Sequence, residues 1–226
     1  KPGQTTAFIG STGSGKSTLV NLIPRFYDVT DGKITIDGTD IRSITQHELR
    51  ERLGYVPQKG VLFSGDIRSN ILYGNPNGSE EEMIEAAEIS QAAEFIGEKK
   101  EKYQSPIAQG GSNVSGGQKQ RLSIARAVAK HPAVYIFDDS FSALDYKTDV
   151  KLRNALKAKT KESTVLIVAQ RISTILHAEQ IIVLDDGRVA GKGTHRELLK
   201  NCEEYYQIAS SQLSEKELEQ DMKEVG

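Results

Sequence analysis

The sequence predicts an α/β fold in which a mainly parallel sheet carries antiparallel hairpins and an inserted helical region. A glycine-rich loop at residues 10–18 stands between a strand pattern and a helix pattern. Short apolar runs at 133–137 and 164–169 alternate with helical patterns, as is typical of strands buried on both faces of a parallel sheet. Asp-Gly pairs at 37–38 and 186–187 follow or separate strand-like segments and indicate hairpin turns.

The glycine-rich loop, Gly-Ser-Thr-Gly-Ser-Gly-Lys-Ser-Thr, fits the phosphate-binding pattern G-x-x-x-x-G-K-[ST]. Residues 5–9 predict the strand before it. Residues 17–26 predict a helix after it with four apolar side chains on one face: Leu19, Leu22, Ile23 and Phe26. A dinucleotide-binding loop fits less well, because Thr18 stands where the pattern G-x-G-x-x-G needs its third glycine.

This loop supplies the residues that we expect to bind the phosphates of a nucleotide: Thr12, Gly13, Ser14, Gly15, Lys16, Ser17 and Thr18. The glycines let backbone N–H groups turn inward around phosphate oxygens, and the following helix directs its positive end at the same oxygens. We expect Lys16 to reach the β- and γ-phosphates and the Ser17 hydroxyl to ligate Mg²⁺. The pattern therefore predicts a nucleotide phosphate site.

The other elements are justified by pattern in chain order. Strands are expected at 33–36 and 54–57, with a short helix at 43–53 between them. Helical patterns then dominate from 58 to about 129, at 66–72, 79–92 and 115–130, with a Gly-, Ser- and Pro-rich loop at 103–114. Ser79 and Glu82 predict a helix cap. Beyond the strand at 133–137 we expect helices at 146–159 and 171–177, a hairpin at 181–192 and a helical tail from 197. The charge-rich part of that tail, 214–224, is expected to be solvated or frayed.

The composition limits the possible functions. The net charge of −2 over 226 residues gives no broad basic surface, so no nucleic acid partner is expected. No apolar run approaches the roughly 18 residues of a membrane span, and no secretory signal opens the chain. The single cysteine, Cys202, excludes an internal disulfide and fits a reducing compartment. Because the chain opens at Lys1, just before a core strand and without an initiator methionine, we interpret it as a piece of a longer polypeptide.

Four further segments follow the loop along the chain: Tyr55-Val56-Pro57-Gln58, 113–121, 134–139 and 142–145. They resemble, respectively, the Q-loop, the signature motif, the Walker B strand and the D-loop of ATP-binding cassette (ABC) proteins, in the order in which that family carries them. Residues 62–71 are similar to the exporter branch of the family. The resemblance covers essentially the whole chain. It implies a P-loop NTPase domain with a RecA-like core at about 1–57 and 131–200, a helical subdomain at about 58–130, and C-terminal helices at about 197–226.

The resemblance also implies roles for single residues. Asp138, at the end of the Walker B strand, would hold Mg²⁺ together with Ser17 and Gln58. At the start of the signature helix, Ser115, Gly116, Gly117 and Gln118 would contact the γ-phosphate held by a partner domain, because ABC domains dimerise head to tail. Asp145 would cross the same interface, although a helix N-cap at this position is an open alternative.

The sequence departs from the family pattern at the two positions nearest the attacking water. Asp139 stands where the family has the glutamate that activates water, and its carboxylate is expected to fall about 1.5 Å short because aspartate lacks one methylene. Gln170 stands at the switch position where the family has histidine; it can donate a hydrogen bond but carries no charge. With Gln58, these are the candidate catalytic residues. We expect ATP binding with slow hydrolysis at this site.

Two smaller departures concern the signature region. Gln109 and Gly110 replace the Glu-Arg pair that exporters carry before the signature, so we expect altered coupling to the membrane domain. The signature itself is intact apart from Val114, which stands where the family has leucine. An intact signature beside an impaired catalytic site makes sense in a heterodimer, where this chain completes a competent site on its partner.

We therefore expect the nucleotide-binding domain of the degenerate-site half of a heterodimeric, bacterial multidrug-type ABC exporter. Its partners would be a second nucleotide-binding domain and the coupling helices of a transmembrane domain, at the cytoplasmic face of the membrane. Alternatives that the sequence leaves open are a soluble ABC ATPase switch in DNA repair or translation, an importer ATPase subunit, and a fragment that only binds ATP and dimerises weakly.

Other candidate residues contribute less to the functional prediction. No Asn-Lys-x-Asp string is present, so a guanine-specific GTPase lacks its base-recognition element. The four histidines, His47, His131, His177 and His195, are expected in surface or capping roles. The aromatic residue that stacks on adenine in this family precedes the P-loop strand, so we expect it upstream of Lys1.

Overall fold

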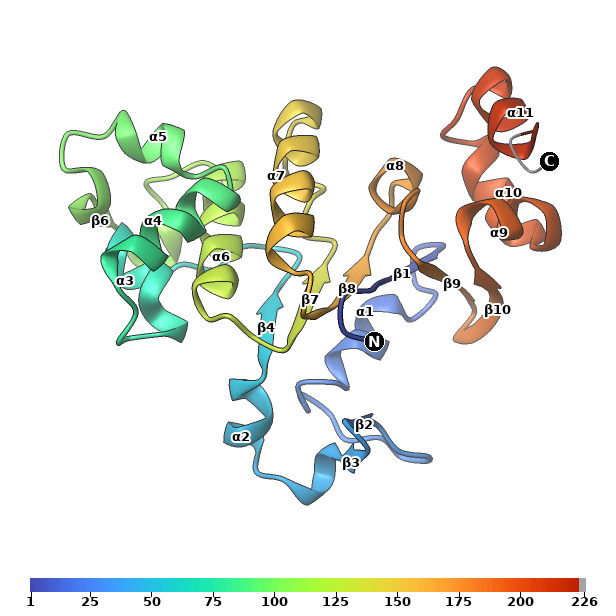
Figure 1. Cartoon of the computed structure of the whole chain (residues 1–226), viewed down its shortest axis with the longest axis horizontal. Coiled ribbons are helices and arrows are strands. Elements are labelled where there is room, and N and C mark those ends of the chain that lie inside the picture. Colours follow the sequence, from blue (N-terminus) through green and yellow to red (C-terminus); the bar gives the residue numbers. More distant parts are fainter. Residues whose placement is uncertain (224–226) are drawn as a thin grey trace.

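A six-stranded, mainly parallel sheet forms the centre of the computed structural model, which describes residues 1–223 (Figure 1). Its strands stand in the order β10-β9-β1-β8-β7-β4; β10 is antiparallel to β9, and the other neighbours are parallel. The strand bounds are β1 Thr5–Gly10, β4 Leu53–Val56, β7 Val134–Asp138, β8 Thr164–Val168, β9 Gln180–Asp185 and β10 Arg188–Gly193. The predicted fold class is confirmed.

Both faces of the sheet are buried, because successive side chains of a strand point to opposite sides. In β1, Ala7 and Ile9 belong to a large core on one face, while Phe8 belongs to a second core on the other. Figure 1 shows α7 (Tyr146–Lys159) and α8 (Ile172–Ile175) above the strands and α1 (Lys16–Asn21) below them. Helices therefore cover the sheet from both sides.

This topology brings distant parts of the chain to one edge. Strand β8 pairs with β1 on one side and with β7 on the other, and all three run parallel. The segments that follow their carboxyl ends therefore meet at the same edge of the sheet, where open α/β sheets place their ligands. Those segments are the glycine-rich loop after β1, Asp139 after β7 and Gln170 after β8.

Helix α1 is shorter than the predicted helix at 17–26 and buries a different side chain. Pro24 lacks the N–H that would bond to the carbonyl of Val20, and its ring crowds that carbonyl, so the helix ends at Asn21. Leu19 and Phe26 are 36% and 47% exposed, whereas Val20 is fully buried. The expected apolar face was wrong for Leu19 and Phe26, whereas Ile23 packs against two buried clusters as expected.

A helical layer lies between β4 and β7 in the chain and to the left in Figure 1. It contains α3 Ile67–Ile71, α4 Glu80–Ile89, α5 Ala93–Gly97 and α6 Gly116–Ala129, with a short antiparallel pair of β5 Gly65–Asp66 and β6 Pro106–Ile107. Helix α6 packs against both α3 and α4. The predicted cap of α4 is confirmed, because Ser79 and Glu82 form a reciprocal capping box.

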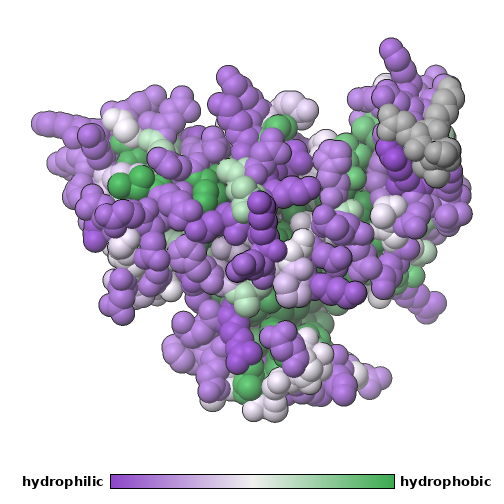
Figure 2. All heavy atoms as spheres, in the orientation of Figure 1, coloured by the Kyte–Doolittle hydropathy of each residue, from purple (hydrophilic) through white to green (hydrophobic). Residues whose placement is uncertain are grey.

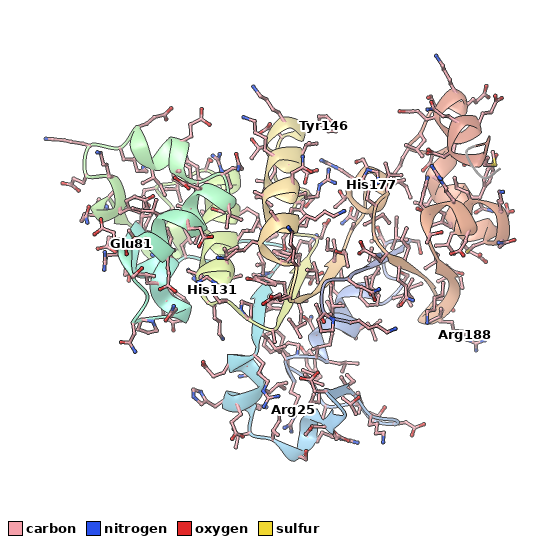
Figure 3. The ribbon with its side chains drawn as sticks, viewed as in Figure 1. Arg25, Glu81, His131, Tyr146, His177 and Arg188 are labelled. Atoms are coloured by element: carbon pink, nitrogen blue, oxygen red, sulfur yellow. The ribbon has the colours of Figure 1, made fainter. Side chains whose placement is uncertain are left out.

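A small lobe lies at the bottom of Figure 1. The predicted hairpin is formed by β2 Thr35–Ile36 and β3 Thr39–Asp40, and the helix expected at 43–53 is shorter, as α2 Gln46–Glu51. Arg25, labelled in Figure 3, donates to the carbonyls of Ile41 and Ile44 at 3.3 Å each and ties this lobe to the segment after α1. Single 3₁₀ turns connect other elements: η1 Ile41–Ser43, η2 Leu72–Gly74, η3 Lys102–Gln104 and η4 Gln109–Gly111.

The chain closes with three helices, α9 His195–Asn201, α10 Glu203–Ser210 and α11 Glu215–Lys223. His195 is buried and lies between the Tyr205 hydroxyl, 2.7 Å from its Nδ1, and a carboxylate oxygen of Asp221, 3.1 Å from its Nε2. Leu218 of α11 is 5% exposed. The expectation that 214–224 is solvated or frayed holds for exposure, because residues 214–217, 219 and 220 are exposed. Fraying was the wrong alternative up to residue 223, because α11 forms and packs onto α9 and α10; residue 224 lies outside the described part of the chain.

The other three histidines are exposed, as expected. Figure 3 labels two of them, His131 and His177, and Nε2 of the first lies 3.4 Å from a carboxylate oxygen of Glu82. The surface in Figure 2 is largely hydrophilic, with hydrophobic residues visible chiefly in its recesses. Across residues 1–223, no helix is both long enough and apolar enough to cross a membrane.

Candidate nucleotide-binding site

The glycine-rich loop joins β1 to α1 in a conformation that depends on glycine. Gly13 and Gly15 have φ of 86° and 95°, values that L side chains rarely adopt. Gly15 is the residue immediately before α1. The loop is also tied to the β9–β10 turn, because the Gly187 N–H donates to the Ser14 carbonyl at 3.2 Å. The loop is thus pre-shaped as a cradle of backbone groups.

Lys16 lies folded into this cradle. Its Nζ donates to the carbonyls of Gly10 and Ser11 at 2.9 and 2.7 Å and to the Ser14 hydroxyl at 3.3 Å. The residue is 8% exposed, and burial lowers the pKa of its ammonium, against the attraction of Asp139 and Asp138. A buried cation held only by neutral oxygens is well suited to gain an anionic partner.

Ser17 and Asp138 converge although 121 positions separate them. The Ser17 hydroxyl donates to Asp138 Oδ1 at 2.8 Å. The Tyr55 hydroxyl donates to Asn21 Oδ1 at 2.8 Å and lies 3.3 Å from Asp138 Oδ2. Hydroxyl and carboxylate oxygens are the donors that Mg²⁺ prefers, so Ser17 and Asp138 fit the predicted metal site.

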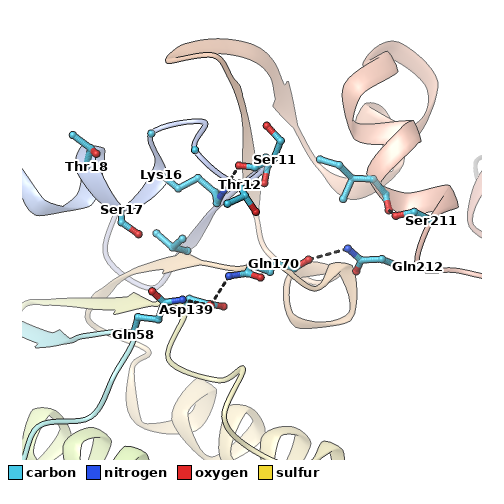
Figure 4. Close-up of a pocket in the computed structure, with 15 residues that line it drawn as sticks. Ser11, Thr12, Lys16, Ser17, Thr18, Gln58, Asp139, Gln170, Ser211 and Gln212 are labelled. Atoms are coloured by element: carbon cyan, nitrogen blue, oxygen red, sulfur yellow. Dashed lines mark hydrogen bonds between the residues drawn. The ribbon is translucent and has the colours of Figure 1, made fainter.

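Asp139 accepts hydrogen bonds from both of the predicted amide residues. Its Oδ2 accepts a hydrogen bond from Gln58 Nε2 at 2.9 Å and one from Gln170 Nε2 at 2.8 Å (Figure 4). Burial raises the pKa of the Asp139 carboxyl, and the hydrogen bonds from Gln58 and Ser142 act in the opposite direction. The three candidate catalytic residues therefore form one hydrogen-bonded group.

A cavity of about 460 Å³ joins the loop to this group, which is within the usual size range of small-molecule sites. Its lining includes Gly10, Ser11, Thr12, Gly13, Gly15, Lys16, Ser17, Thr18, Gln58, Asp139, Val168, Gln170, Ile208, Ser211 and Gln212. A cavity of this size beside Lys16 and a glycine cradle fits a polyphosphate with its metal.

The signature residues take no part in this cavity. The described residues that line the cavity do not include Ser115, Gly116, Gly117, Gln118 or Asp145. Ser115 instead caps α6 in a capping box with Gln118, and Asp145 caps α7 by accepting the N–H of Thr148 at 3.0 Å. A Cβ built on Gly116 meets no atom within 4 Å, so this helix end opens onto free space.

Sequence reasoning assigned no role to three residues that the structure connects to the site. Tyr55 supports Asp138, as described above. Gln120 is 1% exposed. Its Nε2 donates to the carbonyl of Pro57 at 3.1 Å, and its Oε1 accepts the N–H of Gly60 at 2.9 Å, so it contacts the backbone on either side of Gln58. Gln212 lines the cavity from the C-terminal helices. An amide on the apolar face of the α6 pattern was a usable signal for Gln120; nothing in the sequence marked Gln212.

The parallel sheet, the glycine loop before α1 and the paired Ser17 and Asp138 define a P-loop nucleotide-binding domain. The family follows from comparison with known proteins. The family model described as ABC transporter matches residues 1–142, and this chain belongs to the ABC transporter family.

Three relatives are ABC transporter proteins, and two of them are named as exporters. The chain is 48% identical over 215 residues to an uncharacterized ABC transporter ATP-binding protein of Mycobacterium tuberculosis, covering 94% of this chain and 37% of the relative. It is 45% identical over 210 residues to a Staphylococcus aureus protein provisionally named multidrug export ATP-binding/permease protein, covering 93% and 36%. The structure of a bacterial Atm1-family ABC exporter with ATP bound matches with a TM-score of 0.91 at 40% identity, over 94% of this chain and 38% of that one.

These comparisons confirm the resemblance to exporter-type ABC nucleotide-binding domains. The chain spans little more than a third of the length of the relatives it matches.

Proposed function

We propose that this chain is the nucleotide-binding domain of one half of a heterodimeric ABC exporter and that its own site hydrolyses ATP slowly. Members of the family bind ATP, generally with Mg²⁺. One observation carries the proposal of a slow site: Asp139 and Gln170, the two residues that depart from the family pattern, are hydrogen-bonded to each other at 2.8 Å. The printed names of the relatives favour an exporter over a soluble switch or an importer subunit.

The part of the site that binds the phosphates and the metal is complete in its chemistry. Lys16 would exchange the loop carbonyls that now hold its ammonium for phosphate oxygens, which are stronger acceptors because they are charged. Ser17 and Asp138 would hold Mg²⁺, with Tyr55 orienting the Asp138 carboxylate. Bound Mg²⁺ would supply neutralisation of the phosphate charge. These groups favour tight retention of the nucleotide.

The hydrolytic half is weaker for three physical reasons. A general base must reach the proton of the attacking water to about 2.6–3.2 Å, and Asp139 is one methylene shorter than glutamate. Asp139 Oδ2 also already accepts hydrogen bonds from Gln58 and Gln170. Gln170 brings no positive charge to the γ-phosphate. Because general-base assistance is worth about 10²–10⁴-fold, slow turnover with retained binding is the expected result.

The signature end of α6 supports a role for this chain in a partner's site. Ser115 and Gln118 fix the first turn of a 14-residue helix whose opening glycine faces free space. A helix N-terminus with free backbone N–H groups is a ready anion site. We propose that it contacts the γ-phosphate held by a second nucleotide-binding domain that supplies its own catalytic residues.

An exposed aromatic surface supports a membrane-domain partner. Phe63 and Tyr73 stack at 4.4 Å while remaining 43% and 59% exposed, and Arg126 lies over both rings. Beside them, a cavity of about 450 Å³ is lined by Phe26, Tyr55 and Tyr73, among others. We propose that coupling helices of the transmembrane domain dock here, which would place this domain at the cytoplasmic face of the membrane. Exposed aromatics in a groove are typical of such anchors.

Asp139→Glu tests the slow-site proposal in the full-length chain assembled with its partner. With the partner's site inactivated, we expect single-turnover hydrolysis at this site to rise about 10²-fold, because the carboxylate then reaches the water. ATP binding should change less than twofold. Asp139→Asn, which keeps the size and removes the base, is the control and should lower the residual rate. An unchanged rate in Asp139→Glu would mean that carboxylate reach does not limit this site.

A further inference from the structure

Gln212 makes a two-point contact with the backbone of the switch loop. It lies in the turn between α10 and α11, outside the motifs that define the family. Its Nε2 donates to the carbonyl of Gln170 at 2.8 Å (Figure 4). Its Oε1 accepts the N–H of Ile172, also at 2.8 Å. Because one planar amide uses its donor and its acceptor on the same segment, it fixes both the position and the orientation of residues 170–172.

The C-terminal helices hold Gln212 firmly. Its own N–H donates to the carbonyl of Ala209 at 3.0 Å. Ala209 and Tyr205 of α10 are fully buried, and the Tyr205 hydroxyl is hydrogen-bonded to His195 of α9. Gln212 therefore extends from a packed helix end rather than from a free tail, so it can act as a fixed reference point for the loop it contacts.

The contact continues into the nucleotide site. The side chain of Gln170 donates to Asp139 Oδ2, which also accepts from Gln58. Gln212, Gln170, Asp139 and Gln58 thus form one continuous hydrogen-bonded chain, from the C-terminal helices to the loop after β4. Loss of the first link would free the backbone from which the Gln170 amide is aimed.

We propose that Gln212 is a positioning residue: it fixes the backbone of residues 170–172 and thereby directs the Gln170 amide at Asp139 and at the γ-phosphate position. The inference rests on the proposed function for its effect on hydrolysis, but not for its effect on the loop. It assigns to the C-terminal helices a direct part in shaping the nucleotide site.

Amide exchange at Ile172 is the first test, because it reports the contact without any need for activity. In the full-length chain with its partner, Gln212→Ala should raise the exchange rate of the Ile172 N–H by roughly 5- to 30-fold, as two backbone contacts of the loop are lost. Gln212→Glu keeps an acceptor for this N–H and should leave its exchange within about threefold. Gln207→Ala is the matched control: Gln207 lies in the same helix region, is exposed and bonds only locally, to Glu203.

Single-turnover kinetics give the second test. Gln212→Glu loses the donor to the Gln170 carbonyl and sets a carboxylate oxygen against it, so we expect kcat at this site to fall about fivefold while the ATP KM changes less than twofold. Gln212→Ala should lower kcat at least as much. A general loss of folding would instead lower ATP binding and the exchange protection of β1 and β8 together, and Gln207→Ala should change none of these quantities.

The outcomes separate the two proposals. If Gln212→Ala leaves both Ile172 exchange and kcat unchanged, the positioning role is wrong whatever Asp139→Glu does. If exchange rises but kcat does not change, Gln212 holds the loop without directing catalysis, and the inference is overturned. If both change while Asp139→Glu has no effect, the positioning role stands and the slow-site proposal fails.

Discussion

Asp139 adopts a backbone conformation that is uncommon for a residue with a side chain, with φ of 47°. Its neighbours impose this conformation: its N–H donates to the Val168 carbonyl at 3.0 Å, and its carbonyl accepts the Ser142 hydroxyl at 2.9 Å. Because the backbone is fixed from two sides, it cannot move to compensate for a short side chain. Side-chain length alone therefore decides how far the carboxylate reaches, which is why Asp139→Glu is a clean test.

Tyr55 carries a prediction of its own at the residue scale. Its hydroxyl lies 3.3 Å from Asp138 Oδ2 and donates to Asn21, so it fixes the carboxylate that is expected to hold Mg²⁺. Residues that hydrogen-bond to metal ligands typically contribute 10- to 100-fold in metal affinity. Tyr55→Phe should therefore raise the Mg²⁺ concentration required for half-maximal ATP binding by about tenfold.

Magnesium titrations of nucleotide binding would measure this effect, with Tyr206→Phe as the control. Tyr206 is 38% exposed on α10, so loss of its hydroxyl should change nothing. If Tyr55→Phe weakens ATP binding equally with and without Mg²⁺, Tyr55 supports the fold of β4 rather than the metal ligand.

At the scale of elements, the start of α7 shows how one residue can have a structural role that is independent of any interface. The carboxylate of Asp145 accepts the N–H of Thr148 at 3.0 Å and caps the helix, whose Leu152 and Leu156 are buried in the core. Hydrogen bonds from Thr148 lower the pKa of Asp145. The cap that the sequence left open is thus present, and a contact across the dimer interface remains a prediction.

Asp145→Ala should lower the urea midpoint of unfolding, whereas Asp145→Asn should retain most of it, because asparagine caps helices as well as aspartate does. The pKa is lowered on folding, so the contribution of the carboxylate is present above its usual value of 3.8 and is lost as the pH falls through the lowered folded-state pKa. The difference in urea midpoint between wild type and Asp145→Ala should therefore become smaller below about pH 4. The difference in urea midpoint between Asp145→Asn and Asp145→Ala should not change with pH. If the difference in urea midpoint between wild type and Asp145→Ala is the same at pH 7 and pH 3, the role of the charged cap is contradicted.

The elements that the sequence predicted best were those with a local cause. The strands β7 and β8 are short apolar runs, α4 begins at a capping box, and both hairpins turn at Asp-Gly pairs. The errors had other causes. Helix α1 ends early at Pro24, a breaker inside an apparently periodic run. Helix α11 has a charged sequence, yet Leu218 and the bond from Asp221 to His195 hold it in place, and such tertiary contacts leave little trace in a local pattern.

For the candidate site, motif spacing placed the phosphate loop, Asp138, Asp139, Gln58 and Gln170 on the correct elements. Motif spacing could not reveal that Asp139 accepts hydrogen bonds from both Gln58 and Gln170. These residues are far apart in the sequence, and only the strand order of the sheet brings them together. The amides Gln120 and Gln212 were missed for the same reason. Glutamine is common on helix surfaces. Burial and partners distinguish Gln120 from the rest, whereas Gln212 is exposed and only its partners distinguish it.

At the scale of the whole molecule, the chain keeps its two proposed phosphate-binding features apart. The cavity that gathers Lys16 and Asp139 is lined by the P-loop, the strand ends and the C-terminal helices, and the start of α6 is not among its lining residues. The glycine at that helix start faces free space. Under the proposed function, the chemistry of such a domain would be completed only when another domain covers the open helix end. A substitution there should therefore separate folding from assembled activity.

Gly116→Ala is the variant that makes this separation. A Cβ at Gly116 meets nothing within 4 Å in the single domain, so ATP binding and stability of this chain should not change. In the assembled transporter, the methyl group would occupy the space through which the partner's γ-phosphate approaches, and a displacement of about 1 Å can cost about 10²-fold in rate. We expect the ATPase rate of the complex to fall at least tenfold. Gly97→Ala, another helical position where a Cβ meets nothing within 4 Å, is the matched control and should leave the rate unchanged. If Gly116→Ala and Gly97→Ala behave alike, the open end of α6 does not face a nucleotide, and this chain does not lend its signature helix to a partner.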